Sequence, residues 1–228
     1  MAMNIRRTVF WLSFAIVLAL IIWGLVVALN KPLEPPPPKL GTPAPITSAD
    51  HVSSATSTAV TLVEYSDFQC PACQTYYPLV TRLLAEASTT VRLVYRHFPL
   101  NDIGPNGKVI HPNALLAAQA SEAAAKQGKF WEMYTILFDK HVEWTELSDP
   151  HTVFERYASD LGLDSARFKT DIDAAETKSY VLSQKQEGSS ISVNSTPTFF
   201  VNGKGIANPQ NYEQFKSIIE AAARPGTP

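Results

Sequence analysis

The chain has 228 residues, a formal net charge of -2 and 45% hydrophobic residues. That length suits one packed domain with additions better than two large domains. The nearly balanced charge gives no electrostatic basis for binding nucleic acid. Because Cys70 and Cys73 are the only two cysteines, a fold held together by several disulfides is also excluded.

Residues 8–30 are predicted to form a transmembrane anchor, because no charged residue lies between Arg7 and Lys31. As a helix this run spans roughly 33 Å, which exceeds a bilayer core of about 30 Å. Arg6 and Arg7 precede it, so the positive-inside rule places residues 1–7 in the cytoplasm and the catalytic domain in the periplasm or outside the cell. The alternative is a cleaved signal peptide, whose apolar region is usually shorter; either way the bulk of the chain is exported.

Residues 31–58 are predicted to be a proline-rich linker. "PLEPPPPKLGTPAP" favours the extended polyproline conformation, and "ITSADHVSSATST" is small and polar. Residues 59–226 are then the folded domain.

Within that domain the predicted elements alternate between strand and helix. A buried strand over Ala59–Tyr65 precedes the cysteines, a helix begins at Pro71, and a second strand covers Val91–Phe98. A helical block follows at about 110–188, with residues 164–188 as one continuous helix. Two strands joined by an Asn202–Gly203 turn come next, and a last helix is capped by Asn208. This order predicts an α/β fold with a right-handed, parallel βαβ unit and an inserted helical block.

The two cysteines sit where a strand meets a helix, which favours redox chemistry. Unpaired N–H groups at a helix start stabilise a thiolate, the form that attacks disulfides. Cys70 is therefore the predicted nucleophile and Cys73 the resolving thiol. The chain needs no cofactor beyond this redox-active pair. Zinc would need two more ligands, and no two of the five histidines have zinc-finger spacing, so we predict no metal site.

Three other polar residues, Glu64, Asp67 and His97, have different expected roles. Glu64 lies in the apolar strand, on the side of Val60 and Leu62, and burial should raise the pKa of its carboxyl. We hypothesise that it exchanges a proton with Cys73; the alternative is an exposed strand end. Asp67 is expected to be a solvated loop residue, and His97 a hydrogen-bonded residue at a strand end.

Four segments together resemble the DsbA-like branch of the thioredoxin superfamily, in particular its membrane-tethered BdbD-type members. They are "EYSDFQCPAC", "YRHFPL", "HPNALLAAQASEAAAKQGKFWEMYTILF" and "STPTFFVNG". They extend from about residue 60 towards the last helix, so the resemblance covers the whole exported domain.

The resemblance implies a thioredoxin fold with a helical insertion and a buried acid at Glu64. It also implies a cis Pro197 beside the cysteines, with the Thr196 backbone offered to substrate. The implied partners are reduced exported proteins and a membrane reoxidase of the DsbB or VKOR type. One departure is that Pro71 and Ala72 stand between the cysteines, where the best-known members carry histidine; this favours a milder oxidant.

The predicted function is therefore a membrane-anchored oxidoreductase that introduces disulfides into exported proteins. A disulfide isomerase or reductase of the same fold is the enzymatic alternative, because the motif does not fix the direction of exchange. A chaperone-like binding module with an incidental cysteine pair is the alternative from another class.

Overall fold

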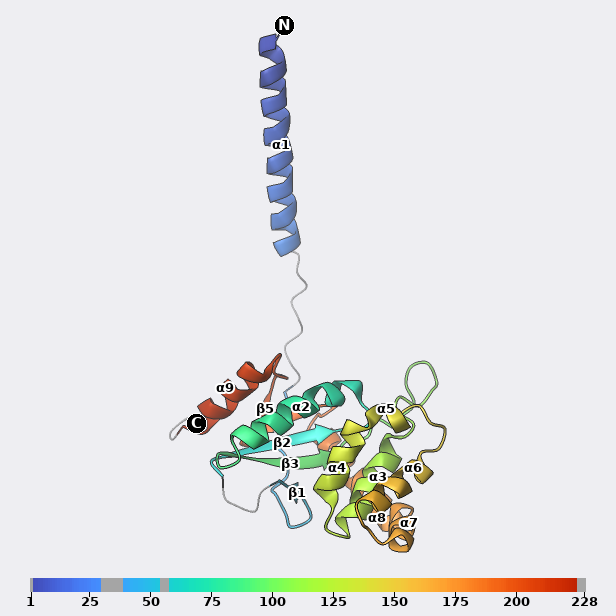
Figure 1. Ribbon diagram of the computed structural model, residues 1–228. Coiled ribbons are helices and arrows are strands. Elements are labelled where there is room, and N and C mark those ends of the chain that lie inside the picture. Colours follow the sequence, from blue (N-terminus) through green and yellow to red (C-terminus); the bar gives the residue numbers. More distant parts are fainter. Residues whose placement is uncertain (1, 30–38, 54–57, 225–228) are drawn as a thin grey trace. The chain divides into compact units, whose positions relative to one another are not determined.

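The computed structural model describes residues 2–29, 39–53 and 58–224. The chain divides into two units, 1–37 and 38–228, and Figure 1 draws both of them. The first unit contains the helix α1 (Ala2–Leu29). Its stretch Arg7–Gly24 has a mean hydropathy of 1.9 and is long and apolar enough to cross a membrane. A signal sequence near the N-terminus can also be this long and apolar.

The second unit is built on one mixed sheet of five strands in the order β1-β3-β2-β4-β5. Strands β2 and β3 are parallel, as the predicted βαβ unit requires, and β4 is antiparallel to β2. The turn between β4 and β5 has positive φ at both Asn202 and Gly203, as a two-residue hairpin demands. The strands are His51–Val52, Val60–Ser66, Val91–His97, Thr198–Val201 and Lys204–Ile206.

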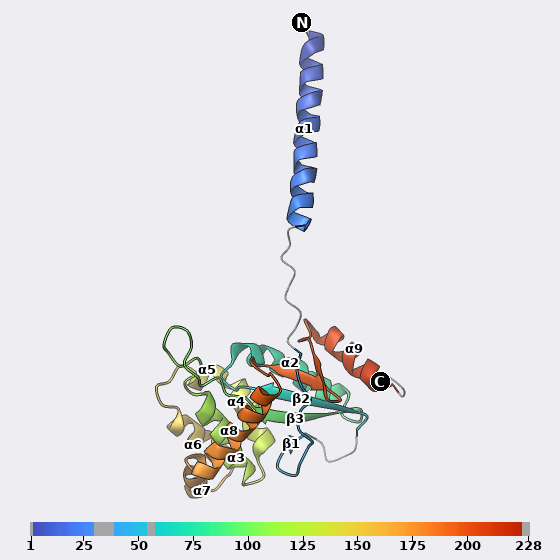
Figure 2. The same ribbon diagram turned by 180° about the vertical axis from the view of Figure 1, so that it is seen from behind.

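The two faces of the sheet pack against different elements. On one face, Val60 and Leu62 join a core cluster with side chains of α2 (Pro71–Glu86) and α9 (Tyr212–Ala222). The opposite face presents Val63 and Tyr65, which pack with residues of β3, β4 and the segment before β1. Figure 1 shows α2 in front of the strands, and the reversed view in Figure 2 brings α8 to the front.

An all-helical insertion separates β3 from β4, as predicted. It carries its own aromatic core, in which Trp144, Phe154 and Tyr157 are fully buried. The expected continuous helix over 164–188 is instead two helices, because Ala174 adopts an extended conformation and becomes the N-cap of α8. The helices α3 to α8 are Ala114–Ala125, Phe130–Asp139, His141–Trp144, His151–Asp160, Ser165–Ile172 and Ala175–Ser190.

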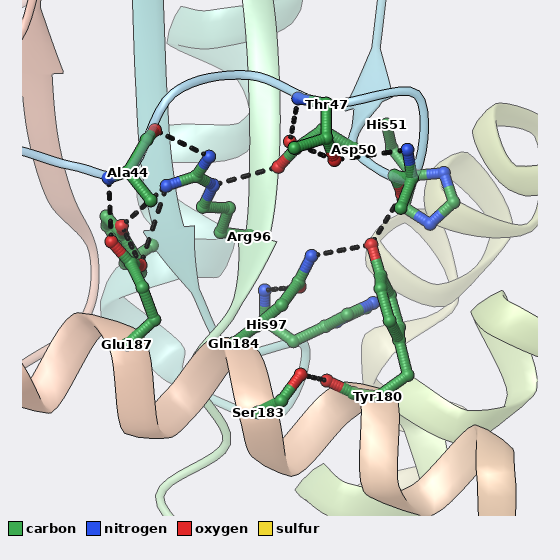
Figure 3. Close-up of polar contacts among 12 residues, drawn as sticks. Ala44, Thr47, Asp50, His51, Arg96, His97, Tyr180, Ser183, Gln184 and Glu187 are labelled. Atoms are coloured by element: carbon green, nitrogen blue, oxygen red, sulfur yellow. Dashed lines mark hydrogen bonds and ion pairs between the residues drawn. The ribbon is translucent and has the colours of Figure 1, made fainter.

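The folded unit begins earlier than the linker prediction of 31–58 allows. His51 and Val52 form β1, which pairs with β3, and Arg96 holds the preceding segment in place. The Arg96 guanidinium pairs with Asp50 at 2.9 Å and donates to the Ala44 carbonyl at 3.0 Å, while Glu187 accepts from the Ala44 N–H (Figure 3). Composition suggested a linker because these anchoring partners are far away in sequence.

The last helix also begins later than predicted. Asn211, not Asn208, is its N-cap and accepts a hydrogen bond from the Gln214 N–H at 2.9 Å. The side chain of Asn208 instead donates to the Pro197 carbonyl at 2.9 Å. Asn208, which the sequence pattern predicts to be a helix cap, therefore supports the loop around Pro197.

Gly188 marks the closest approach of α8 to the sheet. A Cβ at this position would lie 2.9 Å from ring atoms of both Phe98 and Tyr65. Both rings are buried, so they have little room to move away.

We therefore expect Gly188→Ala to lower the free energy of unfolding by about 1–3 kcal/mol through overpacking. Urea denaturation of the full chain measures this. Gln186→Ala, on an exposed position of the same helix, is the matched control. An unchanged midpoint for Gly188→Ala would show that α8 can shift away from the sheet.

Candidate active site

The two cysteines lie at the junction of β2 and α2. Cys70 is the N-cap residue of α2 and Pro71 is its first helical residue. Cys73, one turn further along, is fully buried, whereas Cys70 keeps 6% of its surface exposed. Pro71 and Ala72, the residues between them, are exposed. Only Cys70 is thus open to an incoming sulfur.

The environment separates the acidities of the two thiols. A hydrogen bond from the Cys73 side chain, with further help from Thr196 and the Cys73 backbone N–H, lowers the pKa of Cys70 to about 5. Burial, followed by the interaction with Cys70, raises the pKa of Cys73 well above its usual value. At neutral pH Cys70 is therefore a thiolate and Cys73 a thiol, which suits a nucleophile and a resolving group.

The loop before β4 completes the surroundings of Cys70. The Thr196–Pro197 peptide bond is cis, in line with the resemblance. When Cys70 is in its thiol form, it donates a hydrogen bond to the Thr196 carbonyl, with 3.5 Å between the sulfur and the oxygen. The loop that carries Thr196 and Pro197 thus lies beside Cys70.

Glu64 is 2% exposed, so the alternative of an exposed strand end does not hold. Burial raises the pKa of its carboxyl to about 7, a shift that the Ser66 hydroxyl opposes. The charge of Glu64 in turn contributes to the raised pKa of Cys73. Glu64 thus combines a pKa raised towards neutral pH with a position within electrostatic reach of Cys73.

Asp67 differs from its prediction as a solvated loop residue, since it is only 2% exposed. Its carboxylate accepts hydrogen bonds from the N–H groups of Gln69 and Leu100, at 2.7 and 2.9 Å. It also pairs with Nδ1 of His111 at 2.7 Å. Loop composition suggested solvent exposure. In the structure the carboxylate instead links its own loop to the segment that contains Leu100 and His111.

Three residues that the sequence interpretation did not single out complete the wall beside the cysteines. The Gln69 side chain accepts from the Asn113 N–H at 2.7 Å and donates to the Thr145 carbonyl at 2.7 Å. His111 joins them through Asp67. A pocket of about 260 Å³ opens here, and its lining includes Pro71, His111, His141 and Glu146. Contacts between positions some 40 to 80 residues apart leave no local sequence signal.

One cluster in the described part of the chain has metal-ligand chemistry, and it contains no cysteine. Ligand-type atoms of His51, His97 and Glu122 lie within 4.8 Å of one another. In the structure these atoms pair with one another: one Glu122 oxygen lies 2.6 Å from Nε2 of His51 and 2.7 Å from Nε2 of His97. These two contacts overcome burial and lower the pKa of Glu122 to about 2. The expected hydrogen bonding of His97 is thus present.

Comparisons with known proteins agree with this geometry. The thioredoxin family model matches residues 47–221. Oxidised BdbD from Bacillus subtilis superposes with a TM-score of 0.67 at 23% identity, covering 81% of this chain and 97% of that one. Alpha-DsbA1 from Wolbachia pipientis gives 0.66 at 18%, covering 78% and 92%. A thioredoxin-like oxidoreductase from Silicibacter pomeroyi gives 0.60 at 26%, covering 76% and 91%.

The curated relatives are longer proteins that are named as Na(+)/H(+) antiporters. The Na(+)/H(+) antiporter NhaA 3 of Salinispora tropica is 39% identical over 173 residues, which are 76% of this chain and 24% of that protein. NhaA 1 of Mycolicibacterium vanbaalenii is 35% identical over 215 residues, 92% of this chain and 33% of that protein. The chain thus spans only about a quarter to a third of the relatives it matches. With the family model covering the folded unit and the superposed structures sharing its architecture, the chain belongs to the thioredoxin family and has a DsbA-like fold.

Proposed function

We propose that this chain is a membrane-anchored thiol–disulfide oxidoreductase that introduces disulfides into exported proteins. The observation that carries the proposal is the asymmetry of the cysteine pair. Cys70 is partly exposed with a pKa lowered to about 5, and Cys73 is buried with a raised pKa. A sulfur that is both a stable thiolate and a good leaving group is what an oxidising disulfide needs.

The chemistry is a two-step exchange. A substrate thiolate attacks Cys70 of the Cys70–Cys73 disulfide, which breaks that bond, forms a mixed disulfide and releases the Cys73 thiolate. A second substrate thiolate then attacks the substrate sulfur of the mixed disulfide and releases the Cys70 thiolate. The two substrate thiols lose two electrons and two protons. The cysteine pair gains the electrons, Cys73 takes up one proton, and the other proton passes to solvent because Cys70 remains a thiolate.

Glu64 fits the proton transfer of the first step. Cys73 leaves as a thiolate in a buried place where its thiol form is favoured, so it needs a proton. A carboxyl with a pKa raised to about 7 by burial can supply one. Thr196 and Pro197 would meanwhile hold the substrate backbone beside Cys70.

The anchor and the partner belong to the same proposal. The apolar stretch Arg7–Gly24 is suited to cross a membrane, and Arg6 and Arg7 at its start favour a cytoplasmic N-terminus. The reduced pair would then be reoxidised by a membrane partner of the DsbB or VKOR type. The antiporter name belongs to much longer relatives, of which this chain spans only about a quarter to a third, so the proposal does not include ion exchange.

Trapping thiols in cells tests the proposal and its direction. Cells producing the full chain are acid-quenched and treated with a maleimide of high mass, so that each free thiol retards the protein on a gel. We expect Cys70 and Cys73 mainly oxidised, and a Cys73→Ala variant that accumulates Cys70-linked mixed disulfides. A mainly reduced pair would favour a reductase or isomerase. Full biological activity of Cys70→Ser would favour a chaperone-like module.

The lowered pKa of Cys70 makes a separate prediction about reactivity. In the reduced full chain, alkylation by iodoacetamide should follow the thiolate fraction, rising through a midpoint near pH 5 and staying constant above about pH 6. Cys73 should remain unmodified because it is buried as a thiol. Mass spectrometry of quenched samples assigns each adduct. A midpoint near the usual value for cysteine would contradict the proposed stabilisation.

The role of Glu64 is tested with a substitution that keeps its shape. Glu64→Gln should slow oxidation of a reduced dithiol peptide at pH 7 about 100-fold, the lower end of what general acid–base assistance typically contributes. The pKa of Cys70 should change much less. Stopped-flow tryptophan fluorescence can follow the rate, with Glu86→Gln on the outer part of α2 as control. An unchanged rate for Glu64→Gln would remove the carboxyl from the mechanism.

A further inference from the structure

The residue that most needs an explanation near the cysteines is Asp67. Its carboxylate is buried, immediately before the cysteine turn, and the Asp67 carbonyl accepts a hydrogen bond from the Cys70 N–H at 3.1 Å. Two backbone N–H groups donate hydrogen bonds to its oxygens. A fixed negative charge here acts against the Cys70 thiolate, and it does raise the pKa of Cys70.

His111 counters that charge. Its Nδ1 lies 2.7 Å from the Asp67 carboxylate, and the imidazole side chain keeps 15% of its surface exposed. It is the only cationic side chain that pairs with Asp67 among the residues that the structure describes. His111 and Pro71, the residue next to Cys70, also line the same pocket. The imidazole therefore pairs with a buried carboxylate and lines the same pocket as the turn that carries the nucleophile.

We propose that His111, oriented by Asp67, is a positioning residue that supplies the positive charge facing the Cys70 thiolate and thereby sets the oxidising strength of the cysteine pair. With His111 protonated, the Asp67–His111 pair is neutral overall. With His111 neutral or absent, Asp67 alone faces the thiolate and the reduced form is less stable. The inference rests on the proposed function, because it concerns the same nucleophile.

The titration of His111 is consistent with this role. Burial lowers the pKa of the imidazole, but the hydrogen bond and charge of Asp67, with a further contribution from Cys70, raise it above the usual value. The other titratable groups on the pocket wall are His141 and Glu146. His141 is directed to the Gln69 carbonyl through Nε2 at 3.1 Å, so Asp67 and Cys70 are the groups that act on His111.

Two substitutions in the reduced full chain separate charge from packing. His111→Gln should raise the pKa of Cys70, followed by thiolate absorbance at 240 nm, by about one unit. The equilibrium constant for reduction by glutathione should fall about tenfold, which corresponds to a potential about 30 mV more negative. His111→Lys keeps the positive charge. In this variant the acid dissociation constant of Cys70 and the equilibrium constant with glutathione should both lie within about threefold of the wild-type values. His151→Gln, which removes an exposed histidine paired with Asp149 and Asp173, should change neither.

A measurement on the unaltered chain does not depend on whether the variants fold. Because coupling between two sites is reciprocal, the pKa of His111 should be about one unit higher in the reduced protein, where Cys70 is a thiolate, than in the disulfide form. Imidazole chemical shifts in an NMR pH titration report this difference. Equal His111 pKa values in the two redox states, or equal shifts of the Cys70 pKa in His111→Gln and His111→Lys, would overturn the inference. If Cys70 forms no mixed disulfides at all, the proposed function fails instead.

Discussion

The helix start at Cys70 is the constraint on which the site depends. Parallel strands β2 and β3 end at the same edge of the sheet, and the chain leaving β2 must turn at once into α2. That turn leaves the first N–H groups of the helix without partners inside it. Cys70 is the N-cap residue, and the Cys73 backbone N–H is among the groups that lower the pKa of its thiol. Cys73 follows one turn later, buried under the insertion. Cys70 thereby keeps a small accessible surface and an acidic thiol, whereas Cys73 is fully buried and protonated.

The helical insertion does more than enlarge the domain. Its first residues place His111 against Asp67, and Asn113 anchors the Gln69 side chain. Its interior packs around Phe68 and Tyr95, behind the cysteines. The thioredoxin unit supplies the strand-to-helix turn and the loop with Pro197, while the insertion supplies the wall of the pocket and the charge beside the nucleophile. The electrostatics of Cys70 thus combine contributions from both parts.

Buried acids are the groups whose behaviour the tertiary structure changes most. Glu64 and Asp67 lie three residues apart and are equally buried, yet they have opposite surroundings. Glu64 lies in an apolar strand interior, where burial raises the pKa of its carboxyl. Asp67 is held by two N–H groups and an imidazole, which stabilise its charge. Glu64 is therefore suited to proton transfer, whereas Asp67 is suited to hold the imidazole of His111 in position.

The sequence by itself determined the order of elements, the parallel βαβ unit, the hairpin at Asn202–Gly203 and the identity of the cysteine pair, because these follow from local periodicity, turn chemistry and spacing. It also placed Glu64 on the buried side of its strand. Only the tertiary structure decided that residues 39–53 belong to the folded unit, that Asn208 supports Pro197, and that Asp67 is buried against His111. Each of these depends on contacts between residues far apart in the chain, and such contacts leave no pattern within a single segment.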